Sequence, residues 1–281
     1  MLLVIALLAV MVTMGNDESA DFGFSDRVQV VDLQGEIVDS REVIQQLKRY
    51  EDSNGVRAIL LNIDSPGGGV AVSQELYAEI KRLREKKQKT IVAYMSSTGA
   101  SGAYYVACAA NKIIANPGTV VGSIGVIAEW MNYGDLLEWA KLKDVVFKSG
   151  EFKDTGSASR PLTDREKAYF QSLIDDMYVQ FVEAVASGRH LEIQDVRALA
   201  DGRVFTGRDA KEKKLIDEIG NFQDAVDLTA KLAGITGKPH LIQVGRQRVT
   251  LLDVLTSDLS RIMPFQGRAL KSEIRFQYLW K

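Results

Sequence analysis

A short glycine-rich loop follows a nearly continuous apolar run, and its backbone could stabilise negative charge. The run covers Val56–Ile63, and after Asp64-Ser65-Pro66 the chain continues with Gly67-Gly68-Gly69. Because glycine has no Cβ, its N–H group can approach a ligand closely, and such amides can form an oxyanion hole for a carbonyl under attack. A phosphate cradle is disfavoured because no Gly-Lys-Ser/Thr follows, and a plain tight turn into a helix stays an alternative. Asp64 is expected to shape this turn through its side chain.

A serine with small neighbours lies further along, in Gly99-Ala100-Ser101-Gly102-Ala103, between a predicted strand and a predicted helix. A sharp strand-to-helix turn exposes the serine hydroxyl, as in a nucleophile elbow, although this motif is not Gly-x-Ser-x-Gly. The helix N-terminus would favour negative charge beside it. Ser96 and Ser97 lack the small flanks and are predicted to be loop residues. Tyr104-Tyr105 is expected to pack the helix onto the sheet.

A nucleophilic serine needs a base, and the chain has two histidines, His190 and His240. His190 is expected in a helix C-terminal cap and His240 near a late strand, and neither has a carboxylate in a recognisable triad context. Lys153 is the other candidate, in the small-residue loop Ser149–Asp154, which is expected to follow a strand. A lysine with its ordinary pKa of ~10.4 is protonated at pH 7. A lysine base therefore needs a pKa of about 7–8, which desolvation in an apolar cleft can produce.

Composition excludes several classes of protein. The 281 residues include 35 Lys and Arg against 37 Asp and Glu, and the resulting net charge of −2 argues against a nucleic-acid partner. Hydrophobic residues make up 46% of the chain, which is ordinary for a globular protein. One cysteine and two histidines exclude a disulfide framework and a multi-Cys or poly-His metal site, so neither metal nor cofactor is expected. The cysteine, Cys108, stands among small apolar residues and is predicted to fill the core.

Strands and helices are predicted to alternate along most of the chain. Strands are expected at 28–33, 56–63, 90–95 and 112–115. One helix is expected from Asp39 or Ser40 to about Asn54, and a second after the glycine loop, with Val72, Leu76, Ile80 and Leu83 facing inward. A third, short helix is expected after the Ser101 segment, up to Ala110. This alternation predicts an α/β fold with a parallel sheet. A long helix is expected from Thr163, whose spacing to Glu166 fits a capping box, and further helices to about Leu232. A helix at 250–263 and an irregular tail complete the prediction.

Five motifs occur in an order that resembles one protein family. They are the Asp64–Gly69 loop, Gly99–Tyr105, Gly122–Val126, Lys148–Asp154 and Asp201–Gly207. Together they make residues 28–232 similar to the bacterial signal peptide peptidase A family in its short, single-repeat form. The resemblance implies a serine protease with a Ser/Lys dyad. It also implies a Clp-protease/crotonase-like α/β fold, in which helices flank a parallel sheet and a smaller helical C-terminal part follows.

The family's catalytic residues can be matched to positions in this chain. The resemblance implies Ser101 as the nucleophile and Lys153 as the general base, with Ser123 holding the lysine amine by a hydrogen bond. It implies Gly68 as one donor of the oxyanion hole, and the amide of Gly102, directly after the nucleophile, is the expected second donor.

The resemblance also implies substrates, partners and location. Cleaved signal peptides and other extended peptides are the implied substrates. The implied assembly is a homo-oligomer, a dome of eight subunits, with the dyad shared between protomers. The catalytic domain is expected on the extracytoplasmic side of the bacterial cytoplasmic membrane, held by a single-pass anchor. The apolar tail residues Phe265, Phe276, Tyr278, Leu279 and Trp280 predict that the C-terminus docks on an adjacent subunit, near its substrate groove.

The apolar opening of the chain is interpreted as a membrane anchor, residues 1–15. The run to Met14 would form a helix of about 21 Å against a hydrocarbon core of roughly 30 Å, and no basic residue precedes Arg27, so a truncated or mis-started anchor is expected. Residues 16–27 are predicted to be a linker, 28–232 the Ser/Lys protease domain, and 233–281 a C-terminal extension and tail.

Two other functions stay open. A crotonase-type acyl-CoA hydratase or isomerase shares the glycine oxyanion hole, but it needs placed carboxylates as acid and base. A catalytically silent assembly subunit would have no use for Ser101, Ser123, Lys153 and Gly68, all of which are present.

Overall fold

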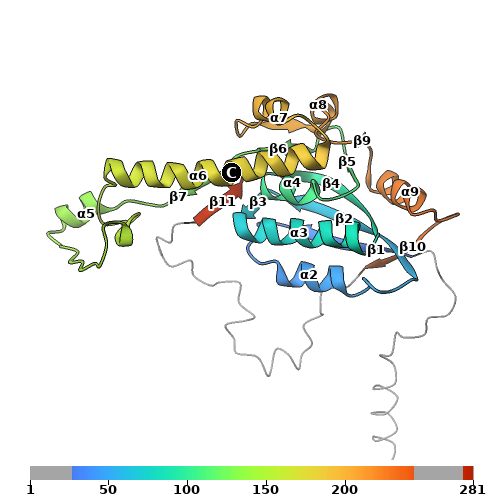
Figure 1. Cartoon of the computed structure of the whole chain (residues 1–281), viewed down its shortest axis with the longest axis horizontal. Coiled ribbons are helices and arrows are strands. Elements are labelled where there is room, and N and C mark those ends of the chain that lie inside the picture. Colours follow the sequence, from blue (N-terminus) through green and yellow to red (C-terminus); the bar gives the residue numbers. More distant parts are fainter. Residues whose placement is uncertain (1–26, 244–274, 281) are drawn as a thin grey trace, which may run out of the picture.

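A mostly parallel sheet of eight strands is the centre of the structure, a computed model that describes residues 27–243 and 275–280 (Figure 1). Its main path runs β10 (His240–Gln243), β1 (Arg27–Gln34), β2 (Val56–Ser65), β4 (Thr90–Ala100), β5 (Lys112–Ala115) and β9 (Glu218–Ile219). Beside it, β6 (Val120–Gly122) pairs parallel with β4, and β8 (Val204–Thr206) pairs antiparallel with β6. The predicted α/β fold is confirmed, with the difference that the sheet is mixed.

A second, smaller sheet lies at one end of the first. Its three strands are antiparallel, in the order β3 (Gly67–Gly69), β11 (Arg275–Leu279) and β7 (Ile127–Glu129). The central strand therefore comes from the C-terminal tail, which was predicted to be irregular. Long-range pairing of this kind leaves no local signal in the sequence.

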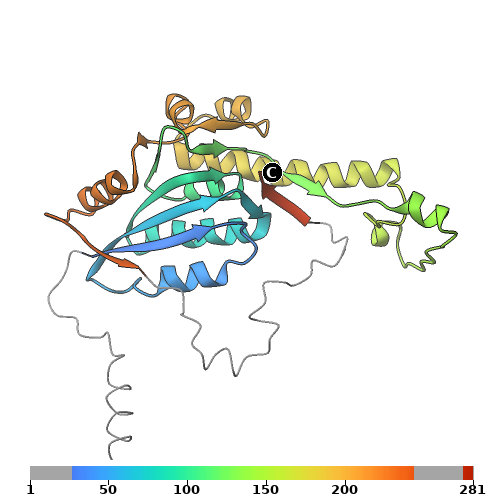
Figure 2. The ribbon, with the colours of Figure 1, turned by 180° about the vertical axis from the view of Figure 1, so that it is seen from behind.

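Helices cover both faces of the large sheet (Figures 1 and 2). The helices of the body are α2 (Arg41–Lys48), α3 (Val70–Lys86), α4 (Gly102–Ala107), α6 (Asp164–Arg189), α7 (Ile193–Leu199), α8 (Gly207–Glu212) and α9 (Phe222–Leu232), whereas α5 (Gly134–Trp139) lies away from the sheet. Strand β2 shows how the faces divide. Ile59, Leu61 and Ile63 belong to the larger core, whereas Ala58 and Leu60 belong to the core beneath α9. Since β2 is buried on both faces, its apolar run is nearly continuous.

Helix α6 connects the body to a projecting arm, residues 130–163 (Figure 1). The helix begins at the predicted capping box, in which Thr163 and Glu166 bond each other's backbone. Its C-terminal part is buried through Phe181, Val182 and Val185, whereas its N-terminal part extends away from the sheet with the arm. The arm exposes many large apolar side chains, namely Met131, Tyr133, Leu136, Trp139, Leu142, Val145, Val146, Phe147 and Phe152.

Three local predictions were wrong. Helix α2 ends at Lys48 rather than near Asn54, and turns follow it, in which Glu51 N donates to Lys48 O and Ser53 N to Tyr50 O, both at 3.2 Å. Ser96 and Ser97 lie within β4, which extends to Ala100 because its end pairs with β6. No strand leads directly into the Lys153 loop, because the last strand before it, β7, ends at Glu129, and this lysine lies on a one-turn 3-10 helix, Glu151–Asp154.

Several predictions fall on residues that the structure does not describe. These are the anchor at 1–15, most of the linker at 16–27, and the helix at 250–263. In the part of the chain that is described, no helix is both long and apolar enough to cross a membrane.

Candidate active site

The parallel pairing of β2 with β4 brings the glycine loop and the Ser101 segment to the same edge of the sheet. Ser65 pairs with Gly99, just before each strand ends. Asp64 helps to hold the two ends together, because its carboxylate accepts from the Thr98 N–H at 3.1 Å. Within the turn itself, the side chain that bonds the backbone is Ser65, whose Oγ accepts from Gly67 N at 3.1 Å. The expected role of Asp64 in shaping the turn stays a prediction.

The Gly68 N–H faces away from the loop that supports it. Gly67 O accepts from Ile37 N at 2.8 Å, and Gly69 N donates to Ile37 O at 2.9 Å. In an extended strand the polar groups of successive residues point to opposite edges, so those of Gly68 point away from Ile37. A Cβ on Gly68 would lie 2.2 Å from Ile37 O. Glycine is therefore the residue that this position accepts.

Ser101 occupies a strained turn between β4 and α4. Its φ of 52° and ψ of −120° lie in a region that residues other than glycine rarely adopt. The turn is fixed because Ser101 N donates to Gly122 O at 2.7 Å and Ser101 O accepts from Tyr105 N at 2.9 Å. This is the backbone that a nucleophile elbow needs. A Cβ on Gly102 would lie 3.1 Å from Gly68 N, so the two expected oxyanion donors belong to touching segments.

Ser123 lies beside Ser101 and also has positive φ, 52°. Its N–H donates to Arg203 O at 2.8 Å, and Gly202 N donates to Ile124 O at 3.1 Å. The Asp201–Gly207 motif therefore acts on the site by holding the backbone of the Ser123 segment. Ser101 and Ser123 line one open cavity of about 560 Å³, together with Val126, Ile127, Ile174, Tyr178, Leu279 and Trp280 among others.

Strand β11 lies in the groove beside Ser101 as an added strand (Figure 1). Tyr278 pairs with Gly68, and Trp280 N donates to Pro66 O at 2.9 Å. Hydrogen-bonded pairs alternate along antiparallel strands, so the register places the Tyr278 carbonyl opposite the Gly68 N–H. The same carbonyl oxygen would lie 3.1 Å from a Cβ on Gly102. The Tyr278–Leu279 peptide bond is thus the one presented to Ser101.

The Tyr278 side chain fills an aromatic pocket. Its ring stacks on Tyr105 with centroids 5.3 Å apart and packs against Phe181 at 4.6 Å. Its hydroxyl donates to Met177 O at 2.8 Å, and burial raises the pKa of this phenol, so it stays protonated. Tyr104 packs α4 onto the sheet as expected and donates to Leu215 O, whereas Tyr105 contributes a wall of the pocket.

Lys153 does not lie in this cavity. It belongs to the arm, at the end of the structure remote from α4 (Figure 1), and its side chain is exposed. Within the described residues its ammonium group has no hydrogen bond or ion pair. The chain therefore brings together Ser101, Gly68, Gly102 and Ser123 but not Lys153. The histidines do not replace it, because His190 is the left-handed C-cap of α6 and His240 lies on β10.

Comparison with known proteins identifies the family. Residues 83–236 match the model of peptidase family S49, and residues 15–121 match that of Clp protease. This chain belongs to peptidase family S49, the signal peptide peptidase A family. Relatives in the family include a Synechocystis protein named as a protease, 44% identical over 195 residues that make up 69% of this S49 chain and 69% of the relative.

Two further relatives have more specific names. An Enterococcus faecium protein named signal peptide peptidase SppA is 37% identical over 193 residues, 69% of this chain and 56% of its own. The chloroplastic serine protease SPPA of Arabidopsis thaliana is 32% identical over 225 residues, 79% of this chain and 33% of its own. The S49 chain thus corresponds to part of each of these proteins, and it is a serine-type peptidase with a Clp-protease-like domain.

Sequence reasoning missed Ile37, Tyr105 and the pairing of Tyr278 in the groove. Nothing in the sequence marks Ile37, because it acts through its backbone. The tail was singled out for its apolar residues, and the docking of the tail on an adjacent subunit stays a prediction. The groove that it occupies here belongs to the same chain rather than to an adjacent one.

Gly68→Ala is expected to lower kcat for peptide cleavage by about 100-fold or more, because the new Cβ must displace the loop and with it an oxyanion donor. Gly118→Ala is the matched control, since a Cβ there meets nothing within 4 Å. Steady-state peptide hydrolysis measures both, with circular dichroism as a check of folding. Equal activity of the two variants would rule out Gly68 as an oxyanion residue.

Proposed function

We propose that this chain is a serine endopeptidase that cleaves extended peptides, above all the signal peptides left in a membrane after their release, through Ser101 and Lys153. The observation that supports this function most is the position of β11. An extended segment lies antiparallel on the Gly67–Gly69 edge with one carbonyl opposite Gly68. Addition of a strand to a sheet edge is a common way to bind a peptide, because the backbone supplies affinity and side-chain pockets supply specificity.

The reaction follows from this placement. The Ser101 hydroxyl attacks the carbonyl carbon while its proton passes to the neutral Lys153 amine, and the Gly68 and Gly102 N–H groups stabilise the oxyanion. Collapse of the tetrahedral intermediate leaves an acyl ester on Ser101, and the departing amine takes the proton from Lys153. Water then attacks the ester with Lys153 again as the base, which releases the acid and restores Ser101. Ser123, beside Ser101, orients the amine.

The base is supplied by a second copy of the chain. Lys153 is exposed on an arm that is remote from Ser101, and the arm displays an apolar surface larger than a monomer usually leaves in water. Docking of the arm on a neighbour would bury this surface and desolvate the amine, as a lysine base requires. A repeated head-to-tail contact of this kind closes into a ring. We propose eight subunits, held at the extracytoplasmic face of the bacterial cytoplasmic membrane by residues 1–15.

A hydratase or isomerase of the crotonase type is less well supported. Its acid and base would have to come from carboxylates in the cavity, where Asp175 and Asp201 are found. Hydrogen bonds from Arg203 lower the pKa of Asp201 to about 2, so this carboxyl group cannot act as an acid near neutral pH. A silent assembly subunit would not need the strained backbone at Ser101, which costs stability.

Ser101→Ala and Lys153→Ala are each expected to abolish peptide cleavage, because each removes a reacting group that does not pack the core. Ser123→Ala should lower the rate of peptide cleavage about tenfold, because it removes one hydrogen bond that orients the amine. When the two inactive chains are co-assembled, sites with one intact serine and one intact lysine should recover part of the activity. Substantial activity of Lys153→Ala alone would disprove the base, and mixed oligomers without recovery would mean that each chain supplies its own dyad.

Cleavage should become faster with rising pH through about pH 7–9, because a lysine base acts only after it has lost its proton. The measurement is kcat/KM for one peptide across this range, under conditions in which chemistry limits the rate. A flat profile from pH 5 to 9 would contradict a lysine base.

The tail should be a substrate of the enzyme. Mass spectrometry of the active protein is expected to find chains that end at Tyr278, since the Tyr278–Leu279 bond is the one presented to Ser101. The Ser101→Ala protein should keep Leu279, Trp280 and Lys281. Tyr278→Asp, which places a charge in the aromatic pocket, should slow this cleavage strongly. An intact tail in a protein that cleaves other peptides would show that β11 is bound in an unreactive register.

A further inference from the structure

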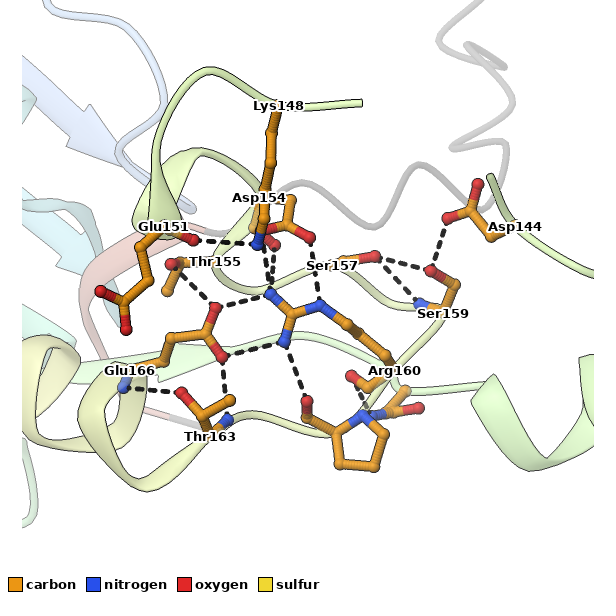
Figure 3. A network of polar contacts seen from close by, with 12 residues as sticks. Asp144, Lys148, Glu151, Asp154, Thr155, Ser157, Ser159, Arg160, Thr163 and Glu166 are labelled. Atoms are coloured by element: carbon orange, nitrogen blue, oxygen red, sulfur yellow. Dashed lines mark hydrogen bonds and ion pairs between the residues drawn. The ribbon is translucent and has the colours of Figure 1, made fainter. Parts of the chain in front are cut away.

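Three charged side chains of the arm and one from the first turn of α6 form a cluster around the turn that carries Lys153 (Figure 3). The charge cluster consists of Lys148, Asp154, Arg160 and Glu166. Asp154 accepts from Lys148 Nζ at 2.6 Å and from Arg160 Nε at 3.1 Å. The other two nitrogens of the Arg160 guanidinium donate to the two oxygens of Glu166 at 2.6 and 2.9 Å. The guanidinium thus joins two carboxylates that are twelve positions apart in the sequence.

Glu166 is the fixed end of this cluster. It is 1% exposed and lies in the first turn of α6, where its carboxylate accepts from the Thr163 N–H at 2.8 Å. The Thr155 hydroxyl donates to it as well, at 3.1 Å. Because α6 continues into the buried core of the body, the position of Glu166 is set by the body. The contacts then run from α6 through Glu166 and Arg160 to Asp154, the residue after Lys153.

The backbone of the turn that carries Lys153 has few hydrogen bonds of its own. Glu151–Asp154 is a single turn of 3-10 helix, a form with poor hydrogen-bond geometry. Its backbone bonds include Lys153 N to Gly150 O and Thr155 N to Phe152 O, both at 3.2 Å, and Ser157 N to Asp154 O at 3.0 Å. Lys148 Nζ also donates to Glu151 O at 3.0 Å. The side chains of Glu151, Phe152 and Lys153 are exposed. Phe152 also packs on Tyr169 of α6, with ring centroids 5.3 Å apart, and the Arg165 guanidinium lies 5.5 Å from the Phe152 ring. The cluster and these contacts together determine where Lys153 lies relative to α6.

A buried ion pair is a poor means of gaining stability, because desolvation of the charges offsets their attraction. Such a pair does fix geometry, because a planar guanidinium can donate hydrogen bonds to two carboxylates in only a few arrangements. A capping box needs a glutamate at this position of the helix, but it does not need that glutamate paired with an arginine from the preceding loop. The burial of these charges, which costs free energy, is therefore explained if the ion pairs serve to fix the geometry of a functional site.

The cluster also neutralises the charges beside Lys153. A free carboxylate next to a lysine favours the protonated, inactive ammonium. Both acidic neighbours have cations of their own, because Asp154 pairs with Lys148 and Arg160, and Glu151 pairs with Arg165 at 2.8 Å. Hydrogen bonds from Arg160 and Lys148 lower the pKa of Asp154 to about 2, and those from Arg160 lower that of Glu166 further below its ordinary value. The cluster thus stays ionised throughout the pH range in which a lysine base would titrate.

We propose that the charge cluster both positions the base and favours its neutral form. The cluster holds the turn that bears Lys153, so that the amine can reach the serine. It also pairs the carboxylate of Asp154 with cations, so that this carboxylate does not favour the protonated ammonium. This inference rests on the proposed role of Lys153. Asp154, Arg160 and Glu166 are positioning residues in it, since none of them touches substrate.

The test compares Asp154→Asn and Arg160→Gln in the full-length protein, with kcat and KM measured from pH 6 to 10. Asp154→Asn removes one negative charge and leaves Lys148 without its carboxylate partner, while Arg160 keeps Glu166, so the midpoint of the pH profile should move down. Arg160→Gln removes one positive charge and leaves Glu166 without its cation, while Asp154 keeps Lys148, so the midpoint should move up. Each shift should be about half a pH unit or more. Both variants should lower the limiting kcat at least fivefold through misplacement of the amine and leave KM within twofold.

Asp164→Asn is the matched control. It makes the same change of carboxylate to amide at the start of α6, on a side chain that pairs with Lys167 outside the cluster, and it should behave as the parent. Glu166→Gln provides a second variant that keeps the shape of the side chain, and it should lower kcat with KM unchanged. Circular dichroism and oligomer size confirm that each variant folds and assembles.

Midpoints that stay with the control, or that move in the same direction in Asp154→Asn and Arg160→Gln, would overturn the proposal. A fall in kcat/KM that comes from a higher KM rather than from a lower kcat would also overturn it. Lys153→Ala, assayed in parallel, separates this outcome from failure of the proposed function. If Lys153→Ala is inactive while the cluster variants match Asp164→Asn, the base stands and the cluster proposal falls. If Lys153→Ala is active, the base itself is wrong.

Discussion

The parallel pairing of β2 with β4 is the constraint on which the site depends. Because the two strands run side by side and end together at Ser65 and Gly99, the loops that leave them must meet. One loop supplies the Gly68 amide and the other supplies Ser101 and Gly102. The continuation of β4 pairs with β6 in turn, which brings Ser123 to the same place. Three segments distant in sequence thus meet through sheet register alone.

The backbone at this edge is specialised more than the side chains are. Gly68 is turned by the two hydrogen bonds of its neighbours to Ile37, and Ser101 and Ser123 both adopt positive φ. These features favour an extended peptide over a compact ligand, because they leave one strand edge open between β3 and β7. Strand β11 fills that edge, and its Tyr278 shows that the groove accepts a large aromatic side chain within the core of the body.

The proposed base comes from a different part of the structure, and its separation has a physical reason. A lysine acts as a base only where water is excluded, and the exposed arm does not exclude water by itself. In the proposed assembly, contact with a neighbour would both bury the arm and complete the site. Activity would then arise only in the assembled enzyme, and an isolated chain would be harmless to other proteins.

The sequence predicted best what is determined locally. Residues 56–63 form the strand that their apolar run indicates, and Thr163 with Glu166 forms the expected capping box. The small residues around Ser101 correctly marked a strand-to-helix turn. The failures depend on distant partners. The length of β4 depends on its pairing with β6, and the strand at Arg275–Leu279 depends on its pairing with Gly67–Gly69. The Arg160 contacts join residues whose types are common on any surface, so no pattern distinguished them.

The most direct measurement is a disulfide between the two halves of the proposed site. A chain with Ser123→Cys and Lys153→Cys, and with the single native cysteine replaced by Cys108→Ala, is produced in isotopically heavy and light forms. The two forms are co-assembled and mildly oxidised, and mass spectrometry identifies the linked peptides. We predict disulfides that join heavy to light peptides, because Lys153 of one copy meets Ser123 of another. Linked peptides that are all heavy or all light, from oligomers shown to be mixed, would contradict the account.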